Sequence, residues 1–208
     1  MTRATYLSFV IILATALALL TLLVLTGRTD SLDFLLRDIL LNLDTQKLVN
    51  FWLDITFLGS VTVIVAFTLL ALIILALQAK WQEAKQFIYG MGGAAIIEVG
   101  FKLVVHRARP NEIFPHTMPL SYSFPSGHAL YAMMLYFLVA STLGNSLPRL
   151  AQLTLWTAVV LIVALIGASR IFLGVHYPTD VLGGYLTAGL WLVILHFHVA
   201  RSKALAGF

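Results

Sequence analysis

Six apolar segments, separated from one another by short polar stretches, run through this chain of 208 residues. A transmembrane helix needs about 20 consecutive apolar residues, and residues 4–26 contain no charged side chain at all. The chain is 60% hydrophobic and 11% charged, whereas a soluble domain is about half apolar and about a quarter charged. The sequence therefore predicts an integral membrane protein with spans over residues 4–26, 55–79, 86–105, 127–143, 153–168 and 181–199.

The predicted fold is all-α, a single membrane-embedded domain over residues 1–208 with six transmembrane helices. Arg3 precedes the first apolar run, as a basic residue does in a signal peptide. That run is longer than the roughly 7–15 apolar residues of a signal peptide, and no small-x-small cleavage site follows it. We therefore expect the first span to be retained.

Residues 30–54 differ from the spans because apolar and charged side chains alternate there with a helical period. Asp33, Arg37 and Asp38 lie off an apolar stripe formed by Leu32, Leu35, Leu36, Ile39, Leu40 and Leu43. This pattern predicts an amphipathic helix in the membrane interface, where it could guide a lipid substrate. The alternative is that the stripe packs against neighbouring spans.

The distribution of basic residues bears on orientation, since six spans place both termini on one side. Cytoplasmic loops carry the excess of Lys and Arg, but the two sides have nearly equal counts. Setting aside Lys102, Arg109 and Arg170 as candidates for chemistry leaves a bias that predicts cytoplasmic termini and outward-facing polar loops. The net charge of +4 suits anionic headgroups or phosphate and not a nucleic-acid groove. The absence of cysteine excludes disulfides and Cys-based metal or redox chemistry.

Three polar clusters lie at span ends on the same predicted side, and the first covers residues 102–110. Lys102, His106 and Arg109 stand at i, i+4 and i+7, so they would share one face of a continuous helix. Glu98 lies one turn before Lys102 and could pair with it, keeping the ammonium charged and aimed. The alternative is that the Lys and the Arg snorkel from a helix end.

The second cluster is Phe124-Pro125-Ser126-Gly127-His128, at the start of the fourth span. Gly127 lets backbone approach a ligand closely. The free N–H groups of a helix N-terminus form an anion site, to which Ser126 adds a hydroxyl. His128 could protonate a leaving group there, or it could be an ordinary polar loop residue.

The third cluster lies between the last two spans and contains Ser169, Arg170, His176 and Asp180. Pro178 suits the first turn of a helix, which would place His176 and Asp180 at a helix entrance. The alternative is a polar loop with a chance histidine. Taken together, the three clusters offer three cations for a phosphate and two histidines, one to attack phosphorus and one to protonate the departing oxygen.

These motifs resemble those of the type 2 phosphatidic acid phosphatase superfamily, which shares its site architecture with vanadium haloperoxidases. Lys102 through Arg109-Pro110 matches the first family motif, Lys, six residues, Arg-Pro. Pro125 to His128 matches the second, Pro-Ser-Gly-His. The third is Ser-Arg, five residues, His, three residues, Asp, and it is matched by Ser169-Arg170, His176 and Asp180.

The resemblance implies a role for each matching position. His176 would be the nucleophile that forms a phosphohistidine, Asp180 would orient it, and His128 would be the general acid and then the base. The phosphate would be held by Lys102, Arg109, Ser126, Gly127 and Arg170. Ser169 would have a supporting role within the third motif, and neither a metal nor another cofactor is expected. Glu98 is not part of the family motifs, and its expected supporting role rests only on its spacing to Lys102. Interfacial packing is expected of the three histidines His116, His196 and His198.

The expected function is a metal-independent lipid phosphatase in a bacterial inner membrane, with its active site on the periplasmic side. Its partners would be the bilayer and a lipid phosphate, with no nucleic acid. Candidate substrates suggested by the family are phosphatidic acid, phosphatidylglycerophosphate and undecaprenyl pyrophosphate. One alternative is a phosphotransferase that uses the same site with another acceptor. Another is a transporter of a phospholipid or polyprenyl phosphate, although that needs no pair of histidines.

Overall fold

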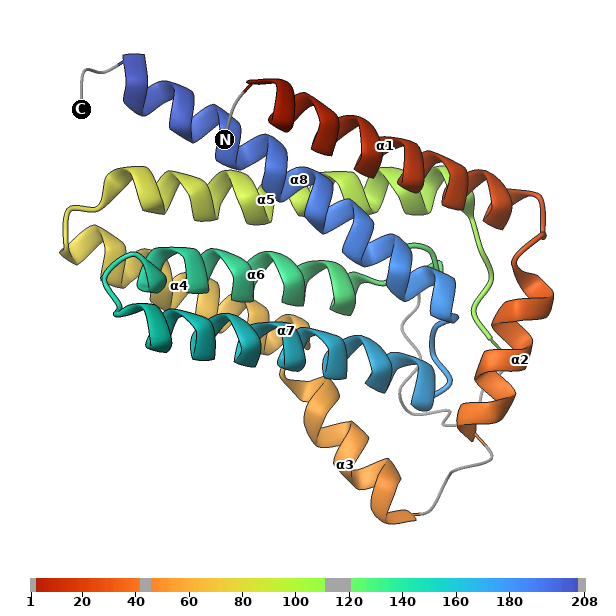
Figure 1. Ribbon diagram of the computed structural model, residues 1–208. Helices are drawn as coiled ribbons and strands as arrows, with labels where there is room; N and C mark the ends of the chain where they lie inside the picture. Colours follow the sequence, from red (N-terminus) through yellow and green to blue (C-terminus); the bar gives the residue numbers. More distant parts are fainter. Residues whose placement is uncertain (1–2, 42–45, 111–120, 206–208) are drawn as a thin grey trace.

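The computed structural model describes residues 3–41, 46–110 and 121–205, and its secondary structure within these ranges is α-helical. Six helical segments are long and apolar enough to cross a membrane, which confirms the prediction of an all-α polytopic membrane protein. The helices are α1 (Arg3–Leu25), α2 (Asp30–Leu41), α3 (Gln46–Phe57), α4 (Val61–Leu77), α5 (Trp81–Val105), α6 (Gly127–Gly144), α7 (Arg149–Phe172) and α8 (Pro178–Leu205) (Figure 1).

Helix α6 lies at the centre of the bundle and packs against α4, α5, α7 and α8. Its side chains Leu130, Met134 and Leu135 are fully buried, and they form one apolar core with Phe87 of α5 and Ala188 of α8. The outer helices instead expose large apolar side chains, because their surroundings are lipid and not water. Each span satisfies its backbone hydrogen bonds internally, so a bundle of helices is one of the few folds that a bilayer accepts.

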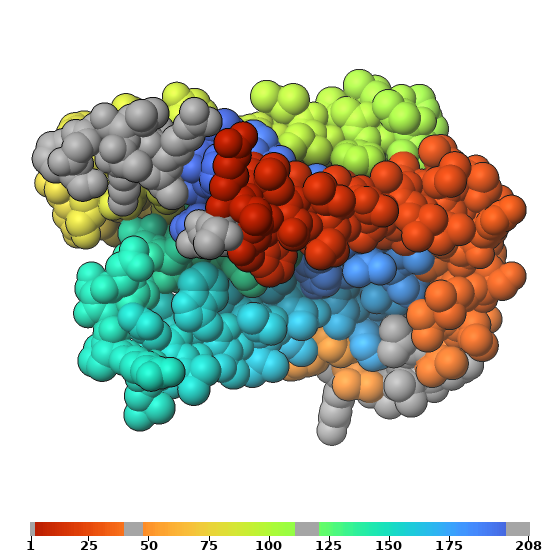
Figure 2. Space-filling model, turned by 45° about the horizontal axis from the view of Figure 1, so that its top comes forward, coloured from red at the N-terminus to blue at the C-terminus, as the bar shows by residue number. Residues whose placement is uncertain are grey.

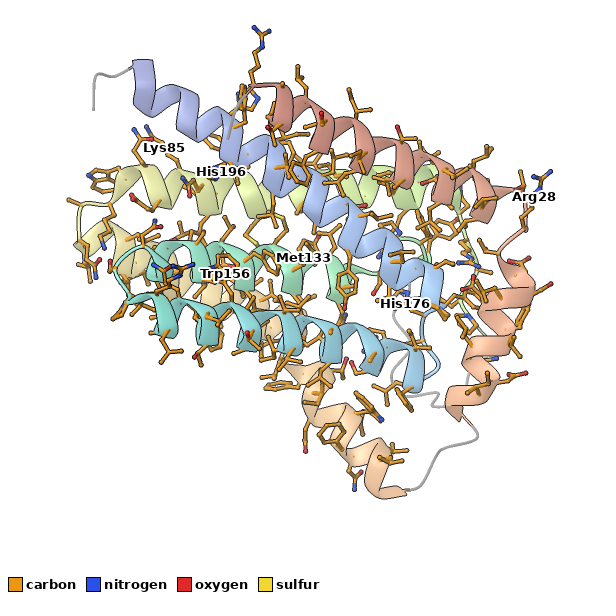
Figure 3. All side chains as sticks on the ribbon, viewed as in Figure 1. Arg28, Lys85, Met133, Trp156, His176 and His196 are labelled. Atoms are coloured by element: carbon orange, nitrogen blue, oxygen red, sulfur yellow. The ribbon has the colours of Figure 1, made fainter. Side chains whose placement is uncertain are left out.

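The first and last spans run side by side in opposite directions. The ring of Tyr6, near the start of α1, stacks on that of Phe197, near the end of α8, with centroids 3.8 Å apart. The start of α1 and the end of α8 therefore lie at the same end of the bundle, while His176 lies at the opposite end (Figures 1 and 3). His196 lies far from His176, near the first end (Figure 3).

The single amphipathic helix predicted over residues 30–54 is wrong in its extent, and residue 55, the predicted start of the second span, lies within α3 (Gln46–Phe57). Two helices occupy this region, α2 ending at Leu41 and α3 running on to Phe57, with residues 42–45 outside the described ranges. The chain then turns, and α4 begins at Val61 after Ser60, whose Oγ accepts a hydrogen bond from the N–H of Val63 (3.4 Å). Apolar residues on both sides of this cap hide the break from a hydropathy pattern.

Helix α2 lies across one end of the bundle, where it joins the long α1 to the rest of the chain (Figures 1 and 2). Its apolar residues Leu32, Leu35 and Ile39 are exposed, whereas Asp33, off that stripe, is completely buried. The apolar stripe faces away from the protein, as contact with lipid requires, and the packing alternative is wrong for these residues. A charged residue is what attaches α2 to the bundle.

Candidate active site

A cavity of about 510 Å³ opens among α4, α5, α6 and the segment that precedes α8. Met91, Ala95, Glu98 and Lys102 line it at spacings of four, three and four, so a single face of α5 forms one wall. The wall is apolar toward the middle of α5 and polar toward its end. The facing part of α4 adds an apolar surface made of Val61, Ile64, Val65 and Leu69. The cavity thus joins a polar end to an apolar groove between two spans.

His176 lies at the polar end of the cavity, on the short connection between α7 and α8 (Figure 3). Gly174 adopts a left-handed conformation (φ +68°) where the chain leaves α7, and Pro178 begins α8 as predicted. Asp180 is the third residue of α8, four residues after His176, and its Oδ2 lies 3.4 Å from Nδ1 of the imidazole. Both side chains are almost entirely buried, which fixes their mutual orientation.

The hydrogen bonds of His176 define its tautomer. Nη1 of Arg109 lies 3.1 Å from Nε2, and because a guanidinium can only donate, Nε2 must be the accepting, unprotonated nitrogen. The proton is therefore on Nδ1, toward Asp180. A lone pair on Nε2 faces the cavity, which is the form that a nucleophilic imidazole needs.

The environment of His176 favours its neutral form. Burial, with a further contribution from the cations Arg109 and Arg170, lowers the pKa of His176 to about 4, against the raising effect of Asp180. The imidazole is therefore unprotonated, and able to attack, throughout the neutral range.

Ser123 completes this group, although it lies outside all three sequence motifs. Its hydroxyl donates to Oδ2 of Asp180 (2.5 Å) and lies 3.3 Å from Nδ1 of His176. The backbone N–H of Tyr177 donates to the same carboxylate oxygen (2.8 Å). The carboxylate of Asp180 is thus fixed from several directions beside the imidazole.

Arg109 is held with its guanidinium across the site. It donates to the backbone carbonyls of Ser121 and Val175, each at 2.7 Å, besides its contact with His176. The Ser121 hydroxyl also accepts from Nζ of Lys102 (3.1 Å), so both cations converge on one residue of the loop. Two positive charges therefore line the same end of the cavity as the imidazole.

Glu98 contacts Lys102 as its spacing predicts, with Oε1 2.7 Å from Nζ. Its other oxygen accepts a hydrogen bond from the hydroxyl of Tyr131 on α6 (2.5 Å). A Cβ on Gly127 would lie 2.5 Å from Oε1 of Glu98, so only glycine lets the start of α6 approach this carboxylate. The requirement at Gly127 is therefore for space beside Glu98 as well as for access to the backbone.

The second histidine, His128, lines the same cavity from the first turn of α6. Ser126 precedes this helix, and its N–H donates to the backbone carbonyl of Asp180 (2.9 Å), which joins the second and third motifs. Nη1 of Arg170 donates to Thr56 (2.6 Å). Within the described ranges, the buried Oγ of Ser126 and Nε of Arg170 have no hydrogen-bond partner. Such orphaned polar atoms suggest a ligand that satisfies them.

The ten residues predicted for the site fall into two groups. Those that line the cavity are Glu98, Lys102, Arg109, Gly127, His128 and His176, and those buried around it are Ser126, Ser169, Arg170 and Asp180. Ser169 donates its hydroxyl to the carbonyl of Ile166 (2.6 Å) and so serves its own helix.

The single helical face predicted for Lys102, His106 and Arg109 is wrong. Helix α5 ends at Val105, and His106 takes a left-handed conformation that turns the chain, with its ring against Tyr122. Lys102 and Arg109 converge through the loop instead. Predicted residue His116 lies outside the described ranges. No local signal identifies Ser121, Ser123 or Tyr131, because their partners are distant in sequence.

Comparison with known proteins gives one family. A sequence model of the PAP2 superfamily matches residues 83–203, more than half of the chain. Phosphatidylglycerophosphatase B of Bacillus subtilis is 40% identical over 93 residues, 44% of this chain and 45% of that protein. An undecaprenyl-diphosphatase of Sulfolobus acidocaldarius is 32% identical over 84 residues, 40% of this chain and 36% of that protein. The chain therefore aligns with less than half of the length of either relative.

Two solved structures resemble the fold over most of their length. A transmembrane PAP2 type phosphatidylglycerolphosphate phosphatase from Bacillus subtilis has a TM-score of 0.76 and 25% identity, covering 92% of this chain and 96% of that chain. LpxE from Aquifex aeolicus has a TM-score of 0.60 and 25% identity, covering 82% and 95%. The likeness extends beyond the matched motifs to the arrangement of the spans.

Proposed function

Because this chain belongs to the PAP2 superfamily, we propose that it is a lipid phosphatase that transfers a phosphoryl group to His176 and then to water. The observation that carries the proposal is the buried His176–Asp180 pair, whose Nε2 lone pair faces a cavity lined by Lys102, Arg109 and His128. An unprotonated imidazole beside fixed cations is suited to attack on a phosphate.

In the first step, Nε2 of His176 attacks phosphorus and the P–O bond to the leaving group breaks. The leaving group is the lipid alcohol of a phosphomonoester or the lipid monophosphate of a diphosphate. Arg109, which lies within hydrogen-bond distance of Nε2, would turn its N–H groups to the phosphate oxygens and release the lone pair. Asp180 accepts a hydrogen bond from Nδ1–H, without taking the proton, and stabilises the positive charge that develops on the ring. His128 donates a proton to the departing oxygen.

In the second step, His128 takes a proton from water, which attacks phosphorus and displaces Nε2 of His176. Inorganic phosphate leaves, and both histidines return to their starting forms. Lys102 and Arg170, the hydroxyl of Ser126 and the N–H groups at the start of α6 would bind the phosphate oxygens in both steps. The orphaned atoms of Ser126 and Arg170 support this assignment.

The apolar groove between α4 and α5 supports a lipid substrate. It continues the cavity away from the charged residues, so acyl or prenyl chains would lie along Val65 and Leu69 while the phosphate reaches His176. The names of the relatives suggest phosphatidylglycerophosphate or undecaprenyl diphosphate as the substrate. Phosphatidic acid is a further candidate because, like phosphatidylglycerophosphate, it carries a terminal phosphomonoester. The cytoplasmic termini predicted from the sequence would put this site on the periplasmic face of a bacterial inner membrane.

The experiment is phosphate release by purified protein in detergent micelles containing excess EDTA. The panel comprises the three lipids and a soluble phosphomonoester, with His176→Ala as the inactive control. We expect EDTA-resistant release from at least one lipid and a loss of several orders of magnitude in the variant. Disappearance of the lipid phosphate without free phosphate would indicate transfer to another acceptor. An active His176→Ala variant would contradict the mechanism.

A further inference from the structure

Arg107 lies on the segment after α5, at one of the six unspecified positions of the first motif, and contacts three other parts of the chain. Its Nη1 donates to Oδ1 of Asp180 (2.8 Å), and its Nη2 donates to Oδ2 of Asp33 on α2 (2.7 Å). Its guanidinium carbon lies 4.2 Å from the centre of the Tyr177 ring. One arginine therefore joins the lipid-exposed helix α2 to the carboxylate beside the nucleophile.

Asp33 fixes the same place from the other side. Its Oδ1 accepts the backbone N–H of Thr179 (3.0 Å), and its Oδ2 accepts the Thr179 hydroxyl (2.6 Å). Thr179 is the second residue of α8, so Asp33 caps from a distant helix the turn that carries Asp180. Nη1 of Arg107 also donates to the Thr179 hydroxyl (2.7 Å), which closes the network.

The charges of this network depend on each other. Asp33 and Asp180 are both completely buried, and a buried carboxylate without a counter-charge is strongly unfavourable. Burial lowers the pKa of Arg107, but the two carboxylates outweigh burial and raise it, so the guanidinium stays charged. Removing Arg107 would leave the two buried carboxylates without the cation that pairs with both.

The two oxygens of the Asp180 carboxylate have different partners, and Arg107 contacts only one of them. It occupies Oδ1, while Oδ2 accepts from Ser123 and Tyr177 and faces the imidazole of His176. Arg107 itself does not line the cavity, so it is not placed to touch a phosphate there. Its effect on the reaction would pass through Asp180 and the adjoining residues Tyr177 and Thr179.

We propose that Arg107 and Asp33 are positioning residues that hold Asp180, and through it His176, in the attacking geometry. Helix α2 thereby becomes part of the active site although it contributes no residue to the cavity. The inference rests on the proposed function, since it assigns Arg107 and Asp33 to the reaction at His176.

The test compares kcat and KM of the wild type with Arg107→Met, Arg107→Lys and Asp33→Asn. We expect kcat to fall by about 10- to 100-fold in Arg107→Met and Asp33→Asn. This is the range typical when a hydrogen-bonding partner that orients a functional side chain is lost. KM should stay within about twofold, and Arg107→Lys, which keeps the charge, should recover part of kcat. Asp30→Asn is the matched control, because Asp30 is 53% exposed and lies 3.4 Å from the same guanidinium. It should behave like the wild type.

The pH dependence of kcat/KM separates positioning from a general loss of structure. The charged or titratable groups that face the His176–Asp180 pair are Arg107 and Arg109 from the segment after α5, His128 from α6 and Arg170 from α7. Asp33 of α2 lies behind them and pairs with Arg107. Without the Arg107 cation, Asp180 favours the imidazolium more strongly and raises the pKa of His176. A proton on either member of the pair removes the active form, so the acid limb should move to higher pH in Arg107→Met.

A double variant tests whether Asp33 acts through Arg107. Asp33→Asn should reduce kcat much less in the Arg107→Met background than in the wild type, because its partner is already absent. Additive effects with an unmoved acid limb would overturn the inference, even in an active enzyme. If Arg107→Met does not fold, Arg107→Lys and Asp33→Asn carry the same comparison. An inactive wild type would instead refute the proposed function.

Discussion

Ser123 shows at the scale of single residues how the site depends on groups outside the motifs. Its hydroxyl is the shortest contact of Asp180 among those the structure describes, and it also faces the proton-bearing Nδ1 of His176. A hydrogen bond to a charged group contributes about 1.5–3 kcal/mol. The reaction uses that carboxylate in each step, so a loss at Ser123 should appear in the rate.

We therefore expect Ser123→Ala to lower kcat by roughly 10- to 100-fold, the equivalent of that free energy. KM for the lipid should change little, because Ser123 does not line the cavity. Ser141→Ala is the matched control, since the Ser141 hydroxyl bonds only the carbonyl of Leu138 among the contacts described. Steady-state phosphate release in micelles measures both. Equal rates for Ser123→Ala and the control would contradict the assigned contact.

Glu98 offers a second test at this scale. It holds Lys102 by an ion pair and is itself held by Tyr131, so it fixes where the ammonium points. Glu98→Gln should raise KM by about tenfold while expression and melting temperature stay near normal. Glu83→Gln, at the start of the same helix, removes an equal charge far from the site. An unchanged or lower KM in Glu98→Gln would mean that the carboxylate serves packing alone.

The motif residues could be predicted from the sequence because their spacing is local. Lys102 and Arg109, or His176 and Asp180, lie within eight residues of each other and carry the chemistry in their side chains. Ser123, Asp33 and Arg107 could not be predicted, because each acquires its role from a partner that the fold brings near. Asp33 and Thr179, for example, are separated by 146 residues.

At the scale of elements, hydropathy located the six spans and missed the break between α3 and α4. Apolar residues flank Gly59 and Ser60 on both sides, so the run looks continuous. The period of the stripe on α2 predicts an amphipathic helix but leaves two directions open, toward lipid or toward neighbouring spans. The structure decides between them by burying Asp33 and exposing Leu35. The solvent, and not the sequence period, decides which face turns outward.

In the proposed function, the groove between α4 and α5 would hold the chains of the lipid substrate, and a substitution at Val65 tests this. Val65 lines the groove and is 49% exposed, so a tryptophan can be accommodated there while it obstructs a lipid chain. We expect Val65→Trp to raise KM several-fold for a long-chain lipid phosphate and to leave a soluble phosphomonoester unaffected. Val160→Trp, on the outside of α7, is the control. An equal rise in KM for both substrates would show that the groove does not bind the lipid chain.

The whole molecule has two distinct ends, with the start of α1 and the end of α8 at one end and the site at the other. Lys85 lies at the end that holds the termini, and Arg28 lies at the end that holds the site (Figure 3). The chain contains no cysteine. Single cysteines at Arg28→Cys and Lys85→Cys therefore report the orientation directly. With cytoplasmic termini, an impermeant maleimide should label Arg28→Cys in spheroplasts and label Lys85→Cys only after lysis. The reverse pattern would place the active site on the cytoplasmic face.

The measurement that addresses the mechanism most directly is identification of the phosphorylated residue. Purified protein would be mixed with ³²P-labelled lipid phosphate, quenched within one turnover at alkaline pH and digested for mass spectrometry. We expect label on His176 that is stable in base and lost in acid. The label should be absent from His176→Ala and reduced in Asp180→Asn. Label on another residue, or phosphate release by His176→Ala at the wild-type rate, would contradict the phosphohistidine mechanism.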